Sequence, residues 1–247
     1  QKKLPQNKQV RSLDPLDLLT KTATIFRQNI STKIIAITGS CGKTSLKELM
    51  GNTFNKMSKT TISPKSYNNK YGVPLSLFNI NQNDDYGILE IGMDKKGEID
   101  QLSRIIQPDI SVITNINYAH AKNFKNIRQI ALAKAEIINN TKDDGRVVLN
   151  ADDAFFNLHK QIAIKKKIKI LSFGINNRNA DIKLNKIFKN KNKYNILVKI
   201  NKFKIDFAIS NNFQNHVYNI LAALAVKSIF FDFLKLNKNI FLNFKTP

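Results

Sequence analysis

The segment Lys33–Ser45 reads KIIAITGSCGKTS and determines how the rest of the chain is interpreted. Its first six residues are mostly β-branched and apolar, which predicts a buried strand over 33–38. The glycine turn Gly39–Gly42 follows directly. Beyond it, apolar side chains recur at the three- and four-residue spacing of a helix: Leu46, Leu49, Met50, Phe54 and Met57. A strand, a glycine turn and a helix in this order predict the opening of an α/β fold.

The same alternation of strands and helices continues along the chain. Apolar runs predict strands at 86–91, 109–114 and 146–149, and helical spacing predicts helices at 98–106 and 127–138. Strands rich in Ile and Val are typical of a mostly parallel sheet covered by helices on both faces. Over residues 168–209 apolar and polar residues alternate, which predicts a small antiparallel β patch. A final helix is expected over 216–231.

The N-terminal part of the chain differs in composition. Its first residues are charged and contain proline, and a short helix is expected over 14–26 with Asp14 as its N-cap and Pro15 at its first position. We therefore expect residues 1–32 to form a tail or linker with one short helix, and residues 33–247 to form one domain.

The amino-acid composition limits the kinds of binding partner and the cellular compartment that we expect. The 40 Lys and Arg residues against 18 Asp and Glu give a formal net charge of +22, which suits either an anionic partner or a lysine-rich surface in solvent. The basic runs 165–167 and 189–193 contain no aromatic residue to stack on bases, so a nucleic-acid partner is not favoured.

A single cysteine, Cys41, excludes a disulfide within the chain and suits a reducing compartment. The most apolar stretch, 220–231, is interrupted by Lys227 and Ser228. No apolar run approaches the ~20 residues that span a bilayer. The sequence therefore predicts a cytoplasmic protein without a membrane span.

The glycine turn carries the strongest chemical signal. A loop between a strand and a helix points backbone N–H groups at a phosphate, and the helix dipole favours the negative charge. The residues of this loop are Gly39, Ser40, Cys41, Gly42, Lys43, Thr44 and Ser45. The Lys43 ammonium suits the β- and γ-phosphates, and the Thr44 hydroxyl suits Mg²⁺. The general pattern has a glycine where Ile37 stands, so this is a shortened phosphate loop. The alternative is a turn that only joins two elements, and the flanking strand and helix favour the phosphate site.

Polar side chains also follow two other predicted strands. Glu90 lies at the end of the strand that begins at Tyr86, and His120 follows the next strand along the chain. Ligands bind at the carboxyl ends of the strands in open parallel sheets, so Glu90 is a candidate Mg²⁺ ligand. A solvent-facing acid and a structural histidine are the alternatives. Asn68 and Asn69 precede a short predicted helix, and such a pair alone indicates a turn.

Lys134 lies within the apolar stripe of its predicted helix. The stripe consists of Ile127, Ile130, Ala131, Ile137 and Ile138. A buried, uncompensated lysine is costly, so Lys134 is expected to be paired, neutral or modified. The alternative is a lysine whose stem crosses the edge of the apolar face while its ammonium stays in water.

Together these segments resemble the central ATPase domain of the Mur ligases, from about Ile34 to Lys227. The resemblance rests on the phosphate loop with Thr38, Asn68-Asn69 with Gly72-Val73-Pro74, Glu90-Ile91-Gly92-Met93 with Gly97-Glu98-Ile99, Thr114-Asn115 with Ala119-His120, Ala133-Lys134-Ala135-Glu136, Asn150-Ala151-Asp152-Asp153, and Asn219 with Ala222-Ala223. Within the family, the asparagine pair followed by Gly-Val-Pro resembles members that add D-alanyl-D-alanine to UDP-N-acetylmuramoyl-tripeptide.

The resemblance implies roles for the matching residues. Lys43 and the loop amides would hold the phosphates of ATP, and Thr44 with Glu90 would hold a Mg²⁺ ion. A second Mg²⁺ would be held by Glu90, His120 and a carbamylated Lys134.

The remaining roles concern the substrates. Asn68 and Asn69 would lie near the γ-phosphate or the substrate, and Asn219 near the adenine. The resemblance also implies a monomeric, ATP-dependent ligase of cell-wall peptidoglycan synthesis that forms an amide bond through an acyl phosphate.

The sequence also departs from the family pattern. Lys65-Ser66 stand where the family usually has Gly-Asn, Ala135 replaces a usual glycine, and Asn215-His216 stand where His-Asn is common. Family members have a UDP-binding N-terminal domain and a C-terminal domain that closes over the site, and we expect neither within this sequence. The chain by itself is therefore expected to bind nucleotide with little or no turnover.

Three alternatives stay open on the sequence. The first is another Mur ligase, such as the tripeptide-forming member. The second is a basic nucleic-acid-binding protein with an incidental phosphate loop, which the net charge of +22 motivates. The third is a degenerate domain that binds nucleotide without catalysis.

Overall fold

The computed structural model describes residues 10–118, 123–190, 193–210, 216–242 and 244. The helices are α1 (Pro15–Gln28), α2 (Lys43–Phe54), α3 (Gly72–Phe78), α4 (Glu98–Ile106), α5 (Ile127–Asn139), α6 (Phe156–Lys165) and α7 (Val217–Phe230). The strands are β1 (Lys33–Thr38), β2 (Thr60–Ile62), β3 (Tyr86–Glu90), β4 (Ile110–Ile113), β5 (Arg146–Asn150), β6 (Lys169–Gly174), β7 (Ile182–Asn190), β8 (Lys193–Ile200) and β9 (Phe203–Ile209). Among the described residues, none of these helices has the length and apolar character needed to cross a membrane.

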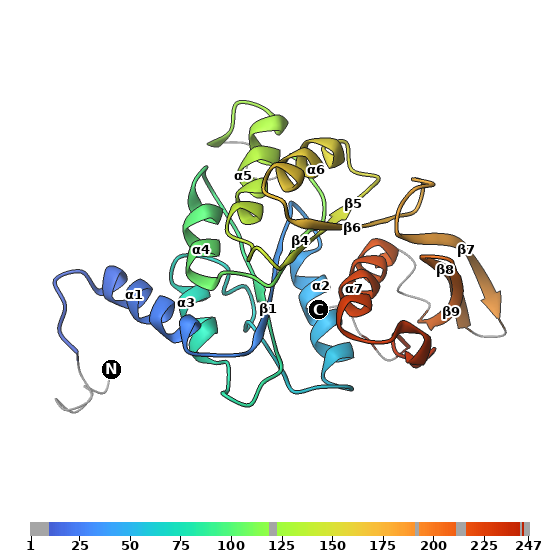
Figure 1. Ribbon diagram of the computed structural model, residues 1–247, viewed down its shortest axis with the longest axis horizontal. Helices are drawn as coiled ribbons and strands as arrows, with labels where there is room; N and C mark the ends of the chain where they lie inside the picture. The colour runs from blue at the N-terminus through green and yellow to red at the C-terminus, as the bar shows by residue number, and fades with distance from the viewer. Residues whose placement is uncertain (1–9, 119–122, 191–192, 211–215, 243, 245–247) are drawn as a thin grey trace.

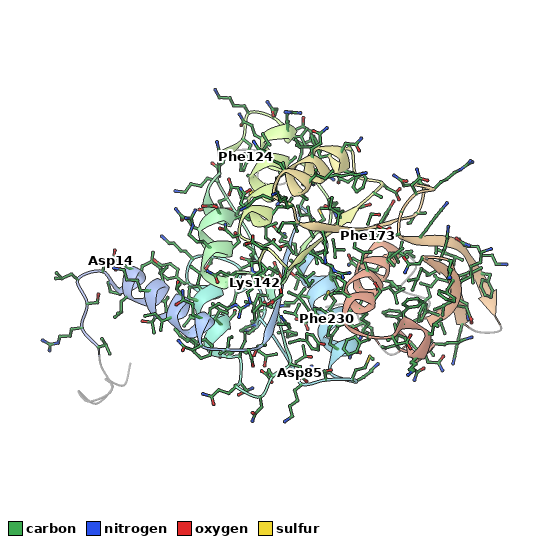
Figure 2. All side chains as sticks on the ribbon, in the orientation of Figure 1. Asp14, Asp85, Phe124, Lys142, Phe173 and Phe230 are labelled. Atoms are coloured by element: carbon green, nitrogen blue, oxygen red, sulfur yellow. The ribbon has the colours of Figure 1, made fainter. Side chains whose placement is uncertain are left out.

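All nine strands form one sheet in the order β2-β3-β1-β4-β5-β6-β7-β8-β9. Neighbouring strands are parallel from β2 to β7, and the pairs β7–β8 and β8–β9 are antiparallel. The antiparallel strands lie at one end of the molecule and α1 lies at the other, with Asp14 at the start of that helix (Figures 1 and 2). The predicted mostly parallel α/β sheet with an antiparallel patch is confirmed.

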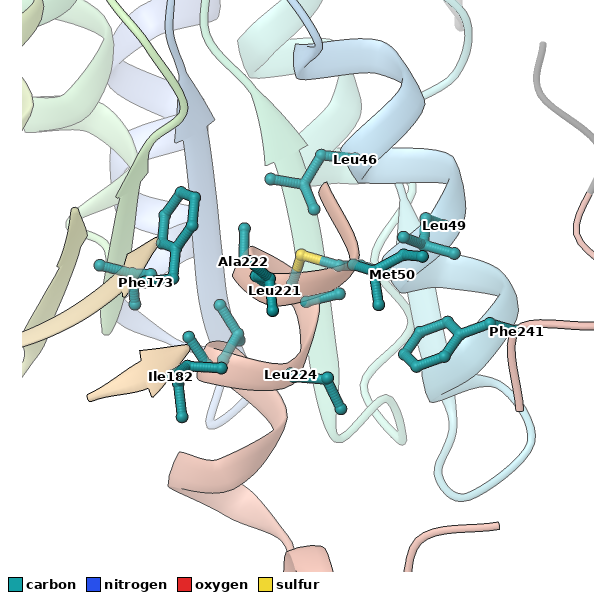
Figure 3. Close-up of a cluster of buried hydrophobic side chains, with 14 of the residues drawn as sticks. Leu46, Leu49, Met50, Phe173, Ile182, Leu221, Ala222, Leu224 and Phe241 are labelled. Atoms are coloured by element: carbon teal, nitrogen blue, oxygen red, sulfur yellow. The ribbon is translucent and has the colours of Figure 1, made fainter. Parts of the chain in front are cut away.

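Helices cover both faces of the sheet because the central strands are apolar on both sides. On β1, Ile35 and Ile37 face a cluster that includes α2 and α7, whereas Ile34 and Ala36 face a cluster that includes the other five helices. In the first cluster, Leu46 and Met50 of α2 lie near Leu221 and Ala222 of α7 (Figure 3). The helix that follows the glycine turn is therefore packed between the sheet and α7.

The antiparallel patch begins at Ile182, so the expectation that it begins near Ile168 was wrong for β6. That strand pairs parallel with β5, Val147 opposite Ile170, because α6 carries the chain back to the starting edge of the sheet. The helix α6 is not among the elements predicted from the sequence. Its buried residues are only His159 and Ala163, which leaves little helical periodicity to detect.

A buried ion pair attaches α1 to the sheet. The Arg27 guanidinium donates to the Ile106 carbonyl at 2.6 Å and to the Asp109 carboxylate at 2.9 Å. Lys33 and Lys142 each approach the other Asp109 oxygen at 3.2 Å. The division of the chain at residue 32 stays a prediction, and the structure adds that α1 packs against α3 and α4.

Candidate nucleotide site

The glycine turn connects β1 to α2 and has room only for glycine at its first position. A Cβ on Gly39 would lie 1.8 Å from the Thr114 hydroxyl oxygen, so any side chain there would collide with the end of β4. Gly42 precedes α2 with a φ of +81°, a left-handed conformation that glycine adopts at no steric cost. The predicted phosphate loop therefore has the tight turn that such a loop requires.

Residues at the end of β4 hold the loop in place. The Cys41 N–H donates to the Asn115 carboxamide oxygen at 3.0 Å, and the Cys41 carbonyl accepts from the Thr114 hydroxyl at 2.7 Å. The Ser40 hydroxyl donates to the Asn117 carbonyl at 3.0 Å. These contacts fix the loop against the residues that follow β4. The sequence alone assigns these residues after β4 no individual role, although polar residues directly after a strand are the available signal.

Two lysines converge on the start of the loop. The Lys43 ammonium donates to the Gly39 carbonyl at 2.9 Å, and Lys134 on α5 donates to the same carbonyl at 3.0 Å. Lys134 is only 2% exposed, which confirms its predicted burial. Burial, and to a smaller extent repulsion from Lys43, lower the pKa of Lys134 to about 7. A large fraction of this amine is therefore neutral near pH 7.

One buried carboxylate links the loop helix to the asparagine pair. Glu90 is 1% exposed at the end of β3. One of its oxygens accepts from the Thr44 hydroxyl at 2.8 Å, and the other accepts from the Asn68 side-chain amide at 2.8 Å. Thr38 lies next to the loop, and its buried hydroxyl has no hydrogen-bond partner in the described part of the chain. The structure thus brings Thr44, Glu90 and Asn68 together.

The other predicted site residues have surroundings of their own, outside the contacts that join Thr44, Glu90 and Asn68. Asn219, at the start of α7, is 8% exposed, and its side-chain oxygen would lie 3.1 Å from a Cβ on Gly42. Ser45 is half-buried in the first turn of α2. The Asn69 side-chain oxygen accepts from the Tyr71 and Gly72 N–H groups and so starts α3. Its proposed role near the substrate stays a prediction.

The predicted metal ligands are only partly covered by the structure. His120 lies outside the described residues, as does Asn215. Within the described ranges, three or more His, Cys, Asp or Glu side chains do not gather into a group that could hold a metal ion. The roles of His120 and Lys134 as ligands of a second Mg²⁺ therefore stay predictions.

A buried lysine that the sequence analysis did not single out supports the loop helix from the side. Lys47 on α2 is fully buried, and its ammonium donates to the Ser63 carbonyl at 2.8 Å and to the Lys65 carbonyl. Lys65 itself has a φ of +45°. The departure from the usual Gly-Asn therefore falls on a residue whose backbone conformation favours glycine.

The comparison with protein families decides the assignment. The Mur ligase middle domain matches residues 37–227 of the chain. The chain belongs to the Mur ligase family. A Buchnera aphidicola protein named UDP-N-acetylmuramoyl-tripeptide--D-alanyl-D-alanine ligase is 40% identical over 149 residues, which are 60% of this chain and 32% of the relative. The Bacillus subtilis ligase of the same name is 31% identical over 223 residues, 88% of this chain and 46% of the relative.

A solved Mur ligase structure agrees with the fold. MurF from Acinetobacter baumannii superposes with a TM-score of 0.81 at 28% identity, covering 89% of this chain and 48% of that one. The chain thus spans about a third to a half of the length of each of these three proteins.

Proposed function

We propose that this chain is the nucleotide-binding part of an ATP-dependent ligase that adds D-alanyl-D-alanine to UDP-N-acetylmuramoyl-tripeptide in peptidoglycan synthesis. The observation that carries the proposal is the tight glycine turn Gly39–Gly42 with the Thr44–Glu90 hydrogen bond beside it. The names of the relatives support the choice of substrates. The reaction uses cytoplasmic ATP, and we propose that the protein acts as a monomer.

The proposed reaction has two steps. The tripeptide carboxylate attacks the γ-phosphorus of ATP, which forms an acyl phosphate and releases ADP. The amine of D-alanyl-D-alanine then attacks the acyl carbon, which forms the amide bond and releases inorganic phosphate and a proton. In the first step, the loop N–H groups and Lys43 would hold the phosphates in line, because positioning and charge stabilisation supply most of the catalysis in phosphoryl transfer. Asn219 would lie near the adenine, as the family resemblance implies.

The donors near the loop suit Mg²⁺. They are oxygens: the Glu90 carboxylate, the Thr44 hydroxyl, and the buried Thr38 hydroxyl at the end of β1, which has no hydrogen-bond partner among the described residues. Glu90 and Thr44 would hold the ion, and Asn68 would keep the carboxylate oriented. When bound, Mg²⁺ supplies positive charge to the phosphate oxygens.

Lys134 is the proposed site of carbamylation. Its neutral amine would attack CO₂ and lose a proton, which replaces an ammonium with an anion and suits a second Mg²⁺ held with Glu90 and His120. The pKa of about 7, caused chiefly by burial, supports the proposal because only the neutral amine is nucleophilic.

The first test measures nucleotide binding by this chain. Mg-ATP is titrated into the wild-type chain, into Lys43→Ala and into Lys204→Ala, an exposed position on β9. Binding that is lost only in Lys43→Ala supports the phosphate loop. Steeply salt-dependent DNA binding that Lys43→Ala leaves intact would instead favour the nucleic-acid-binding alternative.

The second test addresses the reaction. Phosphate release by the full-length ligase containing this domain should require both UDP-N-acetylmuramoyl-tripeptide and D-alanyl-D-alanine. Release that requires a different amine would indicate another Mur ligase. ATP binding without any turnover would indicate a degenerate domain.

A further inference from the structure

Lys227 is a fully buried lysine that the proposed reaction does not use. It lies in the last turn of α7 and is 0% exposed. Its ammonium donates to the Thr53 carbonyl at 3.0 Å and lies 3.4 Å from the Met57 sulfur. Within the described residues, no carboxylate forms an ion pair with it. Burying a charged group without an ion-pair partner costs free energy, so the contacts of Lys227 must offset that cost.

Those contacts lie at the C-terminal end of the phosphate-loop helix. Thr53 belongs to the last turn of α2, where helix carbonyls lack N–H partners within the helix and the dipole favours a cation. The Lys227 ammonium also lies 4.3 Å from the centre of the Phe54 ring and 5.1 Å from that of Phe231. These ring contacts offset part of the cost of burial. Lys227 therefore caps α2 from a neighbouring helix.

The same helix contacts the other end of α2. Asn219, in the first turn of α7, lies against Gly42, the residue that precedes α2. Between the two ends, Leu221 and Ala222 of α7 share a buried cluster with Met50 (Figure 3). The contacting residues Asn219 and Lys227 are about 12 Å apart along α7, and Gly42 and Thr53 are about 17 Å apart along α2.

We infer that α7 fixes the position of the phosphate-loop helix at both ends and that Lys227 is a positioning residue for the nucleotide site. It acts by holding α7 in register with α2, so that Asn219 stays against Gly42. The inference rests on the proposed nucleotide site, but its structural part concerns the loop itself and can be measured without nucleotide.

The test is a double-mutant cycle on nucleotide affinity. Lys227→Met keeps the length of the side chain but removes the cap, and Asn219→Ala removes the contact with Gly42. Substitutions this far apart ordinarily act independently, so their effects on the dissociation constant of Mg-ATP would multiply. If each single variant weakens binding about tenfold, independence predicts about a hundredfold loss in the double variant, whereas shared register predicts little beyond tenfold.

A control separates positioning from general destabilisation. Leu224→Ala removes a fully buried side chain from the middle of α7 while leaving both end contacts in place. At temperatures chosen for equal stability, Lys227→Met should speed amide hydrogen exchange in the loop 39–42 of the nucleotide-free chain, and Leu224→Ala should not. Equal exchange in the two variants, or multiplying effects in the cycle, would overturn the inference. If the wild-type chain binds no nucleotide, the proposed function fails and the exchange comparison alone decides the role of Lys227.

Discussion

Replacing Lys134 with methionine should change how the stability of the chain depends on pH. In the unfolded chain this lysine has its ordinary pKa of 10.5, whereas in the folded chain burial lowers it to about 7. Between these two values the unfolded state binds more protons than the folded state. The free energy of unfolding therefore rises with pH across this window, and the contribution is constant below about pH 7 because both states are then protonated.

The magnitude follows from the linkage relation. One proton bound only by the unfolded state changes the free energy of unfolding by about 1.4 kcal/mol per pH unit. From about pH 7.5 to 9.5, Lys134 should therefore contribute a rise of roughly 2 to 3 kcal/mol. Lys134→Met occupies a similar volume and cannot be protonated, so this part of the rise should disappear.

Urea denaturation of the nucleotide-free chain at several pH values, in buffers freed of CO₂ so that Lys134 carries no carbamate, measures the effect. The quantity compared is the slope of the free energy of unfolding against pH. The other titrating groups are the same in both proteins, so the difference between the two slopes reports Lys134. Lys204→Met, at an exposed position on β9, is the control and should follow the wild-type curve. Parallel curves for wild type and Lys134→Met would refute the argument, because they would mean that the buried amine stays protonated in the folded chain.

Three further outcomes are expected. Lys65→Gly should raise the free energy of unfolding by up to about 1 kcal/mol in urea denaturation, because the φ of +45° at Lys65 suits glycine. A lower free energy of unfolding in this variant would mean that the Lys65 side chain stabilises the fold by more than its backbone conformation costs. Arg27→Met should lower it by about 3 kcal/mol, since the buried Asp109 loses its shortest ion pair, and the double variant with Asp109→Asn should recover part of the loss. Glu90→Gln should weaken ATP binding about tenfold in calorimetry with Mg²⁺ and little with EDTA, as expected for loss of one charged ligand contact; equal weakening in both would argue against a metal role.

The sequence predicts the features that depend on residues close together in the chain. The strand, loop and helix around Gly39 follow from local spacing, and the burial of Lys134 follows from the apolar stripe of its own helix. The direction of β6 could not be derived in this way, because it depends on the crossover through α6, whose apolar pattern is weak. The pairing of β6 was therefore assigned from alternation alone, which parallel and antiparallel strands share.

Contacts between segments far apart in the chain could not be predicted from the sequence either. Lys227 interrupts the most apolar stretch of the chain, yet it is fully buried because the carbonyl end of α2 happens to face it. The family resemblance puts Asn68 near the γ-phosphate or the substrate, but nothing in its spacing indicates the hydrogen bond to Glu90. Both contacts arise from packing between elements, for which a single sequence carries no direct signal.

The two edges of the sheet bear on how the molecule avoids aggregation. An edge strand exposes unpaired N–H and C=O groups that can pair with another chain. At one edge, β2 has only three residues. At the other, β9 carries the exposed Lys204 and follows the exposed Lys202, and its last residues are covered by the Ala208–Lys238 hydrogen bond and the Ile209–Phe241 bridge. Short length, lysine charge and local cover each hinder strand addition, so part of the high positive charge protects the sheet edge rather than serving a ligand.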